Sequence, residues 1–251
     1  MGIINVTPDS FSGDGLGADE DQAVSQGLQM LRDGADLLDV GGESTRPGHV
    51  PISAAEEVSR TAAVVRRLAR ETDVPVSIDT YKLEVAETAV AAGATIVNDI
   101  WGLTRSPGLA ELAARKGCAL LLMHNQDGTE YAGDLMDEVK RFLREAVERA
   151  TQAGVPRERI LIDPGIGFGK TAEQNWEVMR RLGELKALEL PILIGTSRKS
   201  FIGKLLDLPV GDRIEGTAAT VTAAVLRGAD VVRVHDVREM TRVVRVADQM
   251  R

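Results

Sequence analysis

The segment Val90-Ala91-Ala92-Gly93-Ala94-Thr95-Ile96-Val97-Asn98-Asp99 contains the junction that decides the fold. A helical pattern ends in glycine, and an apolar, β-branched run follows within two residues. Glycine after a helix forms a left-handed C-terminal cap, and an apolar run without alternation is typical of a strand buried on both faces. Similar junctions occur at Gly34-Ala35-Asp36, Gly117-Cys118-Ala119 and Gly228-Ala229-Asp230. The chain therefore repeats a helix, a short glycine turn and a buried strand.

Outward from these junctions, we expect strands near 2–6, 36–40, 75–79, 95–99, 119–123, 160–163, 191–195 and 230–234. Amphipathic helices are expected at roughly 18–33, 53–72, 82–92, 107–116, 134–153, 173–187, 211–227 and 237–250. This alternation predicts an α/β fold with a parallel sheet, and its length favours a (β/α)8 TIM barrel. An open, doubly wound sheet is the alternative, although no Gly-x-Gly-x-x-Gly segment follows the first strand.

The organisation of the chain predicts a single barrel domain over residues 1–251, because no proline- or serine-rich linker divides it. The first strand begins almost at Met1, so we expect a segment before it to be missing from this sequence. No apolar run approaches the ~20 residues of a membrane span, and no secretion signal is present, so we expect a cytoplasmic protein without membrane contact.

The composition and net charge of the chain limit the classes of function that it can have. A hydrophobic fraction of 43% and a charged fraction of 27% indicate a globular chain. Its net charge of −8 disfavours a nucleic-acid partner and favours small molecules. The single cysteine, Cys118, lies beside an apolar run, which excludes an internal disulfide and predicts a buried strand residue.

Polar residues gather at the carboxyl ends of the expected strands, namely Asn5, Asp39, Asp79, Asn98, His124, Asp163, Arg233 and His235. In a barrel these ends converge on one mouth, where active sites are found. Phe11, Phe168 and Phe201 fall in glycine- or serine-rich loops on the same side. This placement predicts a flat ligand at the mouth, with loops that pack on themselves as the alternative.

Several ordered motifs resemble those of the dihydropteroate synthase family: 1–12 (MGIINVTPDSFS), 39–48 (DVGGESTRPG), 77–80 (SIDT), 97–100 (VNDI), 163–170 (DPGIGFGK), 197–201 (SRKSF) and 233–237 (RVHDV). The resemblance spans nearly the whole chain. It implies a (β/α)8 barrel that joins p-aminobenzoate to 6-hydroxymethyl-7,8-dihydropterin diphosphate in folate biosynthesis and releases pyrophosphate.

A dihydropterin has a dense edge of hydrogen-bond donors and acceptors, and short, rigid side chains suit such an edge. Asp79, Asn98 and Asp163 meet this demand and match the family's pterin-binding positions. A metal site at the acidic pair is the alternative. The resemblance adds Lys199 as a pterin contact and makes Arg46, Lys199 and Asp79 the catalytic residues.

The diphosphate needs cations and donors, because negative charge grows on the leaving group. The residues expected to bind it are Asn5, Thr45, Arg46, Arg233 and His235. Mg²⁺ commonly takes one or two protein oxygens together with substrate phosphates. The resemblance implies that Asn5 is the Mg²⁺ ligand, with Asp9 as a weaker candidate.

The resemblance places p-aminobenzoate among Phe11, Thr45, Pro47, Phe168 and Ser200. No side chain is suited to covalent attack, so the mechanism is expected to be dissociative. Sulfonamides mimic p-aminobenzoate, and resistant members of the family carry extra residues beside the strand-6 phenylalanine. The sequence 167–170 has no such insertion, so we expect a sulfonamide target.

Two loops depart from the usual family pattern, at 12–15 (SGDG) and 123–131 (MHNQDGTEY). His124 and Arg198 each remain open to a structural or a functional interpretation. Pterin-dependent methyltransferases and a non-catalytic pterin-binding paralogue are the alternative functions. A homodimer through the C-terminal helices is implied by the resemblance alone.

Overall fold

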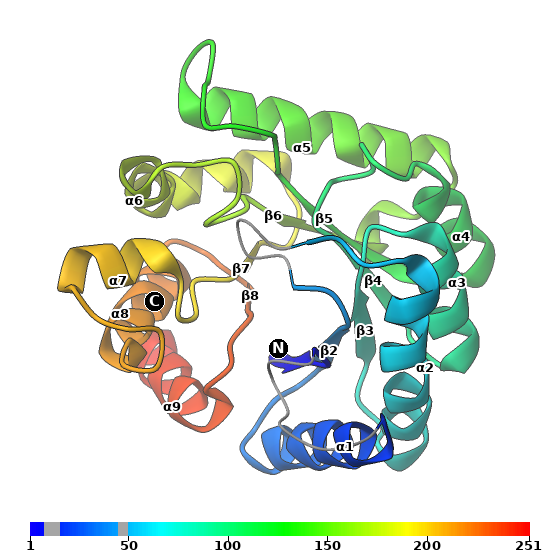
Figure 1. Ribbon diagram of the computed structural model, residues 1–251. Coiled ribbons are helices and arrows are strands. Elements are labelled where there is room, and N and C mark those ends of the chain that lie inside the picture. Colours follow the sequence, from blue (N-terminus) through cyan, green and yellow to red (C-terminus); the bar gives the residue numbers. More distant parts are fainter. Residues whose placement is uncertain (8–15, 45–49) are drawn as a thin grey trace.

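The protein, described here from a computed structural model, is a barrel of parallel strands surrounded by helices (Figure 1). The structure describes residues 1–7, 16–44 and 50–251. Its strands are β1 (Gly2–Asn5), β2 (Leu38–Gly41), β3 (Val76–Asp79), β4 (Ile96–Asp99), β5 (Ala119–Met123), β6 (Ile160–Asp163), β7 (Leu193–Ile194) and β8 (Val231–Val232). Six of them form one continuous sheet in chain order, and β7 pairs with β8.

Backbone hydrogen bonds close the two sheets into one ring. Ile162 N donates to Pro191 O at 3.0 Å, which joins the end strand β6 to the segment before β7. On the other side, Ile3 N donates to Val234 O and Val234 N donates to Met1 O, each at 3.0 Å. These bridges confirm the barrel and exclude the open sheet.

The helices cover the outside of this ring. They are α1 (Leu16–Arg32), α2 (Ala54–Glu71), α3 (Leu83–Ala92), α4 (Gly108–Lys116), α5 (Leu135–Gln152), α6 (Ala172–Arg181), α7 (Ser200–Leu206), α8 (Ile214–Leu226) and α9 (Val237–Ala247). The described chain also has three short 3₁₀ segments: η1 (Arg157–Arg159) before β6, η2 (Leu182–Leu188) after α6 and η3 (Asp248–Met250) after α9. In the described chain, no helix is both long and apolar enough to cross a membrane.

The expected elements differ from the structure mainly near β7. Helix α7 is not predicted from the sequence, and the helix expected at 211–227 begins at Ile214. Helix α7 has only seven residues, too few for a clear amphipathic period. Its position depends on Arg213, whose Nε and Nη2 donate to Leu208 O at 3.1 and 2.9 Å and whose Nη1 donates to Arg198 O at 3.0 Å. These side-chain contacts span 5 and 15 positions and follow neither a helix nor a strand period, so no hydrophobic pattern predicts them.

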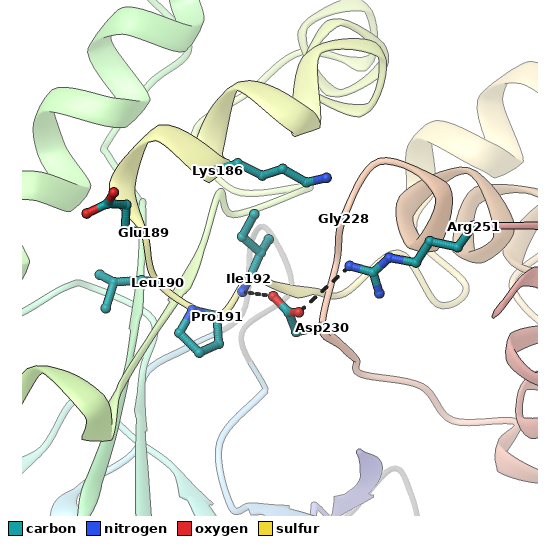
Figure 2. A pocket seen from close by; sticks show the side chains of 8 residues that line it. All are labelled: Lys186, Glu189, Leu190, Pro191, Ile192, Gly228, Asp230 and Arg251. Carbon is teal, nitrogen blue, oxygen red and sulfur yellow. Dashed lines mark hydrogen bonds and ion pairs between the residues drawn. The ribbon is translucent and has the colours of Figure 1, made fainter.

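The amino-terminal side of β7 and β8 carries an open cleft of about 420 Å³ (Figure 2). Asp230 lies at its centre, where Oδ2 accepts a hydrogen bond from Ile192 N at 2.9 Å. The cleft precedes both strands, so it lies at the opposite end of the barrel from the expected mouth. Active sites of this fold form at the carboxyl ends, and the other end serves stability.

Candidate active site

The carboxyl ends of β2, β3, β4 and β8 meet in one hydrogen-bonded network. Arg233 follows β8 directly, and its Nε donates to Asp39 Oδ2 at 2.7 Å while its Nη2 donates to Asp79 Oδ2 at 2.7 Å. Asn98 Nδ2 donates to the same Asp39 oxygen at 3.1 Å. The barrel therefore brings two of the three expected pterin residues and one expected diphosphate residue together.

Two acceptor atoms remain unpaired in this network. Oδ1 of Asp39 and Oδ1 of Asp79 are both buried, and neither has a hydrogen-bond partner among the described residues. A buried acceptor without a partner costs about 1–3 kcal/mol, so it is a strong indication that a ligand donor belongs there. The second oxygen of Asp79 is thus available to a polar ligand.

The protonation of Asp39 and Asp79 depends on one cation, Arg233, which contacts both buried carboxylates. Burial raises the pKa of Asp79 to about 7, the nearby guanidinium of Arg233 opposes this rise, and the like charge of Asp39 adds to it. A carboxyl group with this pKa exchanges a proton near neutral pH, which is common at functional sites.

Asp163 and Lys199 extend the site across β6 and β7. Asp163 Oδ1 accepts a hydrogen bond from Gly165 N at 2.7 Å, and burial raises the pKa of this carboxyl. The ammonium of Lys199 lies 4.1 Å from the ring centroid of Phe168, within cation–π range. Burial and then Arg233 lower the pKa of Lys199 to about 8. The third expected pterin residue and the expected lysine thus belong to the same charged cluster.

His235 is a donor rather than a cation at neutral pH, because burial lowers its pKa to about 3. Its backbone N–H donates to Ser197 Oγ at 3.1 Å, and its Nδ1 lies 3.0 Å from the same oxygen. Arg198 pairs with Asp236: its Nε donates to Asp236 Oδ2 at 3.0 Å, on a backbone with φ of 58°.

The remaining expected residues divide into three groups. Asn5 ends β1 with a partly buried side chain, and Ser200 begins α7 with an exposed one. Phe201, in contrast, is buried and packs edge-on against Trp176 with ring centroids 4.5 Å apart. Its expected exposure to a ligand was wrong, because α7 turns the ring into the core. Outside the described residues lie Asp9, Phe11, Thr45, Arg46 and Pro47.

A buried cluster of charged side chains, which the sequence did not predict, connects described residues on the two sides of 45–49. Lys82 Nζ donates to Glu43 Oε2 at 2.5 Å, to Glu57 Oε2 at 2.7 Å and to Ile52 O at 2.8 Å. These groups come from three separate elements, so no spacing in the sequence connects them. Asp39 was expected at the mouth but without a role, although its position at a strand end is a signal for one.

The barrel and its mouth define a class of protein: a (β/α)8 enzyme fold with buried carboxylates, an amide and cations at the carboxyl ends of its strands. Residues 1–235 match the family model of the pterin binding enzymes, and the chain belongs to that family.

Within this family, the chain is similar to dihydropteroate synthases. It is 51% identical to that of Clostridium beijerinckii over 99% of this chain and 92% of the relative. The crystal structure of the Clostridium difficile dihydropteroate synthase in the presence of pteroic acid has a TM-score of 0.97 and 49% identity, covering 100% of this chain and 95% of that one. The Yersinia pestis enzyme with a sulfonamide drug has a TM-score of 0.93 and 42% identity, over 100% and 93%.

Proposed function

We propose that the mouth of this barrel condenses 6-hydroxymethyl-7,8-dihydropterin diphosphate with p-aminobenzoate, giving 7,8-dihydropteroate and pyrophosphate. The chain is an enzyme, a transferase of folate biosynthesis, and we place it in the cytoplasm. The observation that carries the proposal is the hydrogen-bonded network of Asp39, Asp79, Asn98 and Arg233. In it, one buried oxygen of each aspartate has no partner among the described residues and can accept from a ligand donor. Similarity to dihydropteroate synthases over the full chain supports it.

The pterin lies, in this proposal, against Asp79, Asn98 and Asp163. Carboxylate oxygens accept from the N–H groups of the heterocycle, and the Asn98 amide is oriented because its Nδ2 already donates to Asp39. Lys199 contributes a donor from the opposite side of the mouth. Because these groups are already fixed in position, the site strongly favours the correct ligand. An analogue without a matching donor leaves a buried acceptor unpaired.

The diphosphate is bound by Arg233 and His235, together with Thr45 and Arg46 from the β2–α2 connection. Two of the five N–H donors of the Arg233 guanidinium are used by Asp39 and Asp79, so others can contact phosphate oxygen. His235 acts as a neutral donor in this arrangement. These groups stabilise charge that develops on the departing pyrophosphate.

Mg²⁺ is proposed to bind this site as a complex with the substrate diphosphate. Among the described residues, no group of three or more His, Cys, Asp or Glu side chains could hold a metal ion. One amide oxygen from Asn5 suits a hard cation that keeps waters and substrate phosphates as its other ligands. When bound, the ion would neutralise charge on the leaving diphosphate.

The reaction is proposed to be dissociative. The bond between the exocyclic carbon and the diphosphate oxygen breaks, and its electron pair leaves with pyrophosphate. The resulting pterin cation is then attacked by the amine of p-aminobenzoate, which loses a proton as the C–N bond forms. Phe168 and Ser200, with Phe11, Thr45 and Pro47, hold this second substrate.

A homodimer through the C-terminal helices is also proposed. The exposed large apolar residues of the described chain lie mostly there: Leu205, Leu206, Val210, Leu226, Val246 and Met250. Covering them with a second copy would remove apolar surface from water. Sedimentation of the protein at micromolar concentration tests this proposal, and a monomer would contradict it.

One assay separates the proposed reaction from its alternatives. The protein is incubated with dihydropterin diphosphate, p-aminobenzoate and Mg²⁺, and pyrophosphate is measured together with dihydropteroate. Equal amounts of the two products support the synthase. Pterin binding without either product would favour the non-catalytic paralogue or a methyltransferase-like enzyme, which needs no group to bind diphosphate.

A further inference from the structure

The loops after β5 and β6 are packed against each other through their backbones. A Cβ atom added at Gly165 would lie 1.9 Å from His124 O, and one at Gly169 would lie 2.8 Å from Gln126 O. Both glycines have positive φ, 71° and 56°. Only glycine satisfies both demands, so the β6–α6 loop is built to lie directly on the β5–α5 loop.

Lys170 is the centre of this contact. Its side chain is buried, and its Nζ donates to Gly165 O and Phe168 O, each at 3.1 Å, and to His124 Nδ1 at 2.9 Å. Burial lowers the pKa of Lys170 to about 7, and in its protonated form the amine has three N–H donors, all of which these three acceptors use. The loop from Gly165 to Phe168 is thus wrapped around one buried amine.

His124 completes the contact from the β5 side. Burial and the charge of Lys170 lower its pKa to about 3, so the ring is neutral and its Nδ1 can accept from the lysine. The ring is held between Tyr131, stacked at 6.0 Å between centroids, and Phe142, edge-on at 4.9 Å. The acceptor therefore has a fixed position.

Tyr131 holds the next carbonyl of the same loop. Its hydroxyl donates to Gly169 O at 2.8 Å. Together, Lys170 and Tyr131 fix the carbonyls of Gly165, Phe168 and Gly169, the backbone that carries Phe168, whose ring lies beside the Lys199 ammonium. Tyr131 belongs to the segment 123–131 that departs from the usual family pattern.

We propose that Lys170, His124 and Tyr131 form a clamp that positions Phe168 and thereby sets the affinity for the aryl amine. They act as positioning residues, since they hold the loop rather than touch the reacting atoms. Of the three expected pterin residues, Asp79 and Asn98 have no hydrogen bond to this loop among the described residues, whereas Asp163 Oδ1 accepts from Gly165 N at 2.7 Å. The clamp therefore acts first on p-aminobenzoate, and it reaches the pterin site only through the contact of Gly165 N with Asp163. This inference rests on the proposed function of Phe168.

Two substitutions test the clamp at different strengths. Tyr131→Phe removes one hydroxyl and leaves the ring beside His124, while Lys170→Met removes all three donors. Lys140→Met is the matched control, because Lys140 lies on the outer helix α5 and pairs with Asp137 of the same helix and Glu184 of η2. For each variant, the KM for p-aminobenzoate, the Kd for dihydropterin diphosphate and the amide hydrogen exchange of residues 164–170 are measured.

Tyr131→Phe should raise the KM for p-aminobenzoate by up to about tenfold, the usual worth of one hydrogen bond, and leave the pterin Kd almost unchanged. Exchange of the Gly165, Gly167 and Phe168 amides, all hydrogen-bonded in the wild type, should become faster. Lys170→Met should raise the KM for p-aminobenzoate and the amide exchange rates more than Tyr131→Phe does. If the Lys170→Met protein fails to fold, the Tyr131→Phe variant decides. Lys140→Met should change nothing.

Equal losses for both substrates, or an unchanged KM in a folded variant, would overturn the clamp as a determinant of aryl-amine affinity. If the wild-type protein released no pyrophosphate, the proposed function would fail instead. The clamp would then be judged on hydrogen exchange, and an unchanged rate in both variants would overturn it.

Discussion

Nη2 of Arg233 donates to Oδ2 of Asp79 at 2.7 Å, although 154 positions separate the two residues in sequence. The contact crosses the barrel mouth from the end of β8 to the end of β3. Because the guanidinium also pairs with Asp39, one positive charge serves two buried carboxylates. The two carboxylates, when both are ionised, therefore exceed the charge of Arg233 by one, and they favour ligand N–H donors.

Asp79→Ala should abolish detectable pterin binding. Each ligand donor left unpaired costs about 1–3 kcal/mol, so loss of this acceptor should raise the pterin Kd by about 100-fold or more. Calorimetry with the pterin measures the effect. Asp21→Ala, at an exposed position on α1, is the control. Unchanged affinity in a folded Asp79→Ala protein would remove Asp79 from the site.

The pH dependence of kcat/KM for the pterin should be bell-shaped. Asp79 must be ionised to accept from ligand N–H groups, and its pKa is raised to about 7, so activity is lost as pH falls through this value. Lys199 must be protonated, and its pKa is lowered to about 8, so activity is lost as pH rises through that value. Lys199→Arg should move only the basic limb to higher pH. A flat profile between pH 6 and 9 would contradict both assignments, since ~1 pH unit on either side of these pKa values should change the rate.

Arg46→Ala should lower turnover far more than it weakens binding of a pterin without diphosphate. The arginine is expected to contact only the leaving group, and removal of one such charged donor typically costs about 10²–10³ in kcat. Steady-state kinetics and calorimetry on the same protein give the two numbers. Similar losses in both would indicate a general role in stability.

A simple sulfonamide should inhibit competitively against p-aminobenzoate, and pyrophosphate should strengthen the inhibition. The inhibitor has the size, the aniline nitrogen and the acidic end of the natural amine, so a pocket that accepts one accepts the other. Titration of the steady-state rate gives the inhibition constant. A value orders of magnitude above the KM for p-aminobenzoate would show that the pocket discriminates between them.

The strands and their polar ends could be predicted from sequence because the signals are local. Glycine caps such as Gly93, with φ of 118°, mark the ends of several helices, and the buried run that follows marks the strand. Once eight such units close into a barrel, Asp79, Asn98 and Asp163 must face one mouth. The resemblance to a family then assigned their ligand.

Contacts between loops could not be predicted in this way. The pairing of Lys170 with His124 spans 46 positions and depends on how two loops pack, which no periodic pattern encodes. The burial of Phe201 could not be predicted for the same reason. Its loop-like surroundings suggested exposure, but the short helix α7 buries its ring against Trp176.

The most direct test of this account is the rate of 7,8-dihydropteroate formation from dihydropterin diphosphate, p-aminobenzoate and Mg²⁺, measured side by side for the wild-type, Asp79→Ala and Asp21→Ala proteins. The account predicts stoichiometric dihydropteroate and pyrophosphate from the wild type and from Asp21→Ala, and almost none from Asp79→Ala. No product from the wild type, or equal rates from all three proteins, would contradict it.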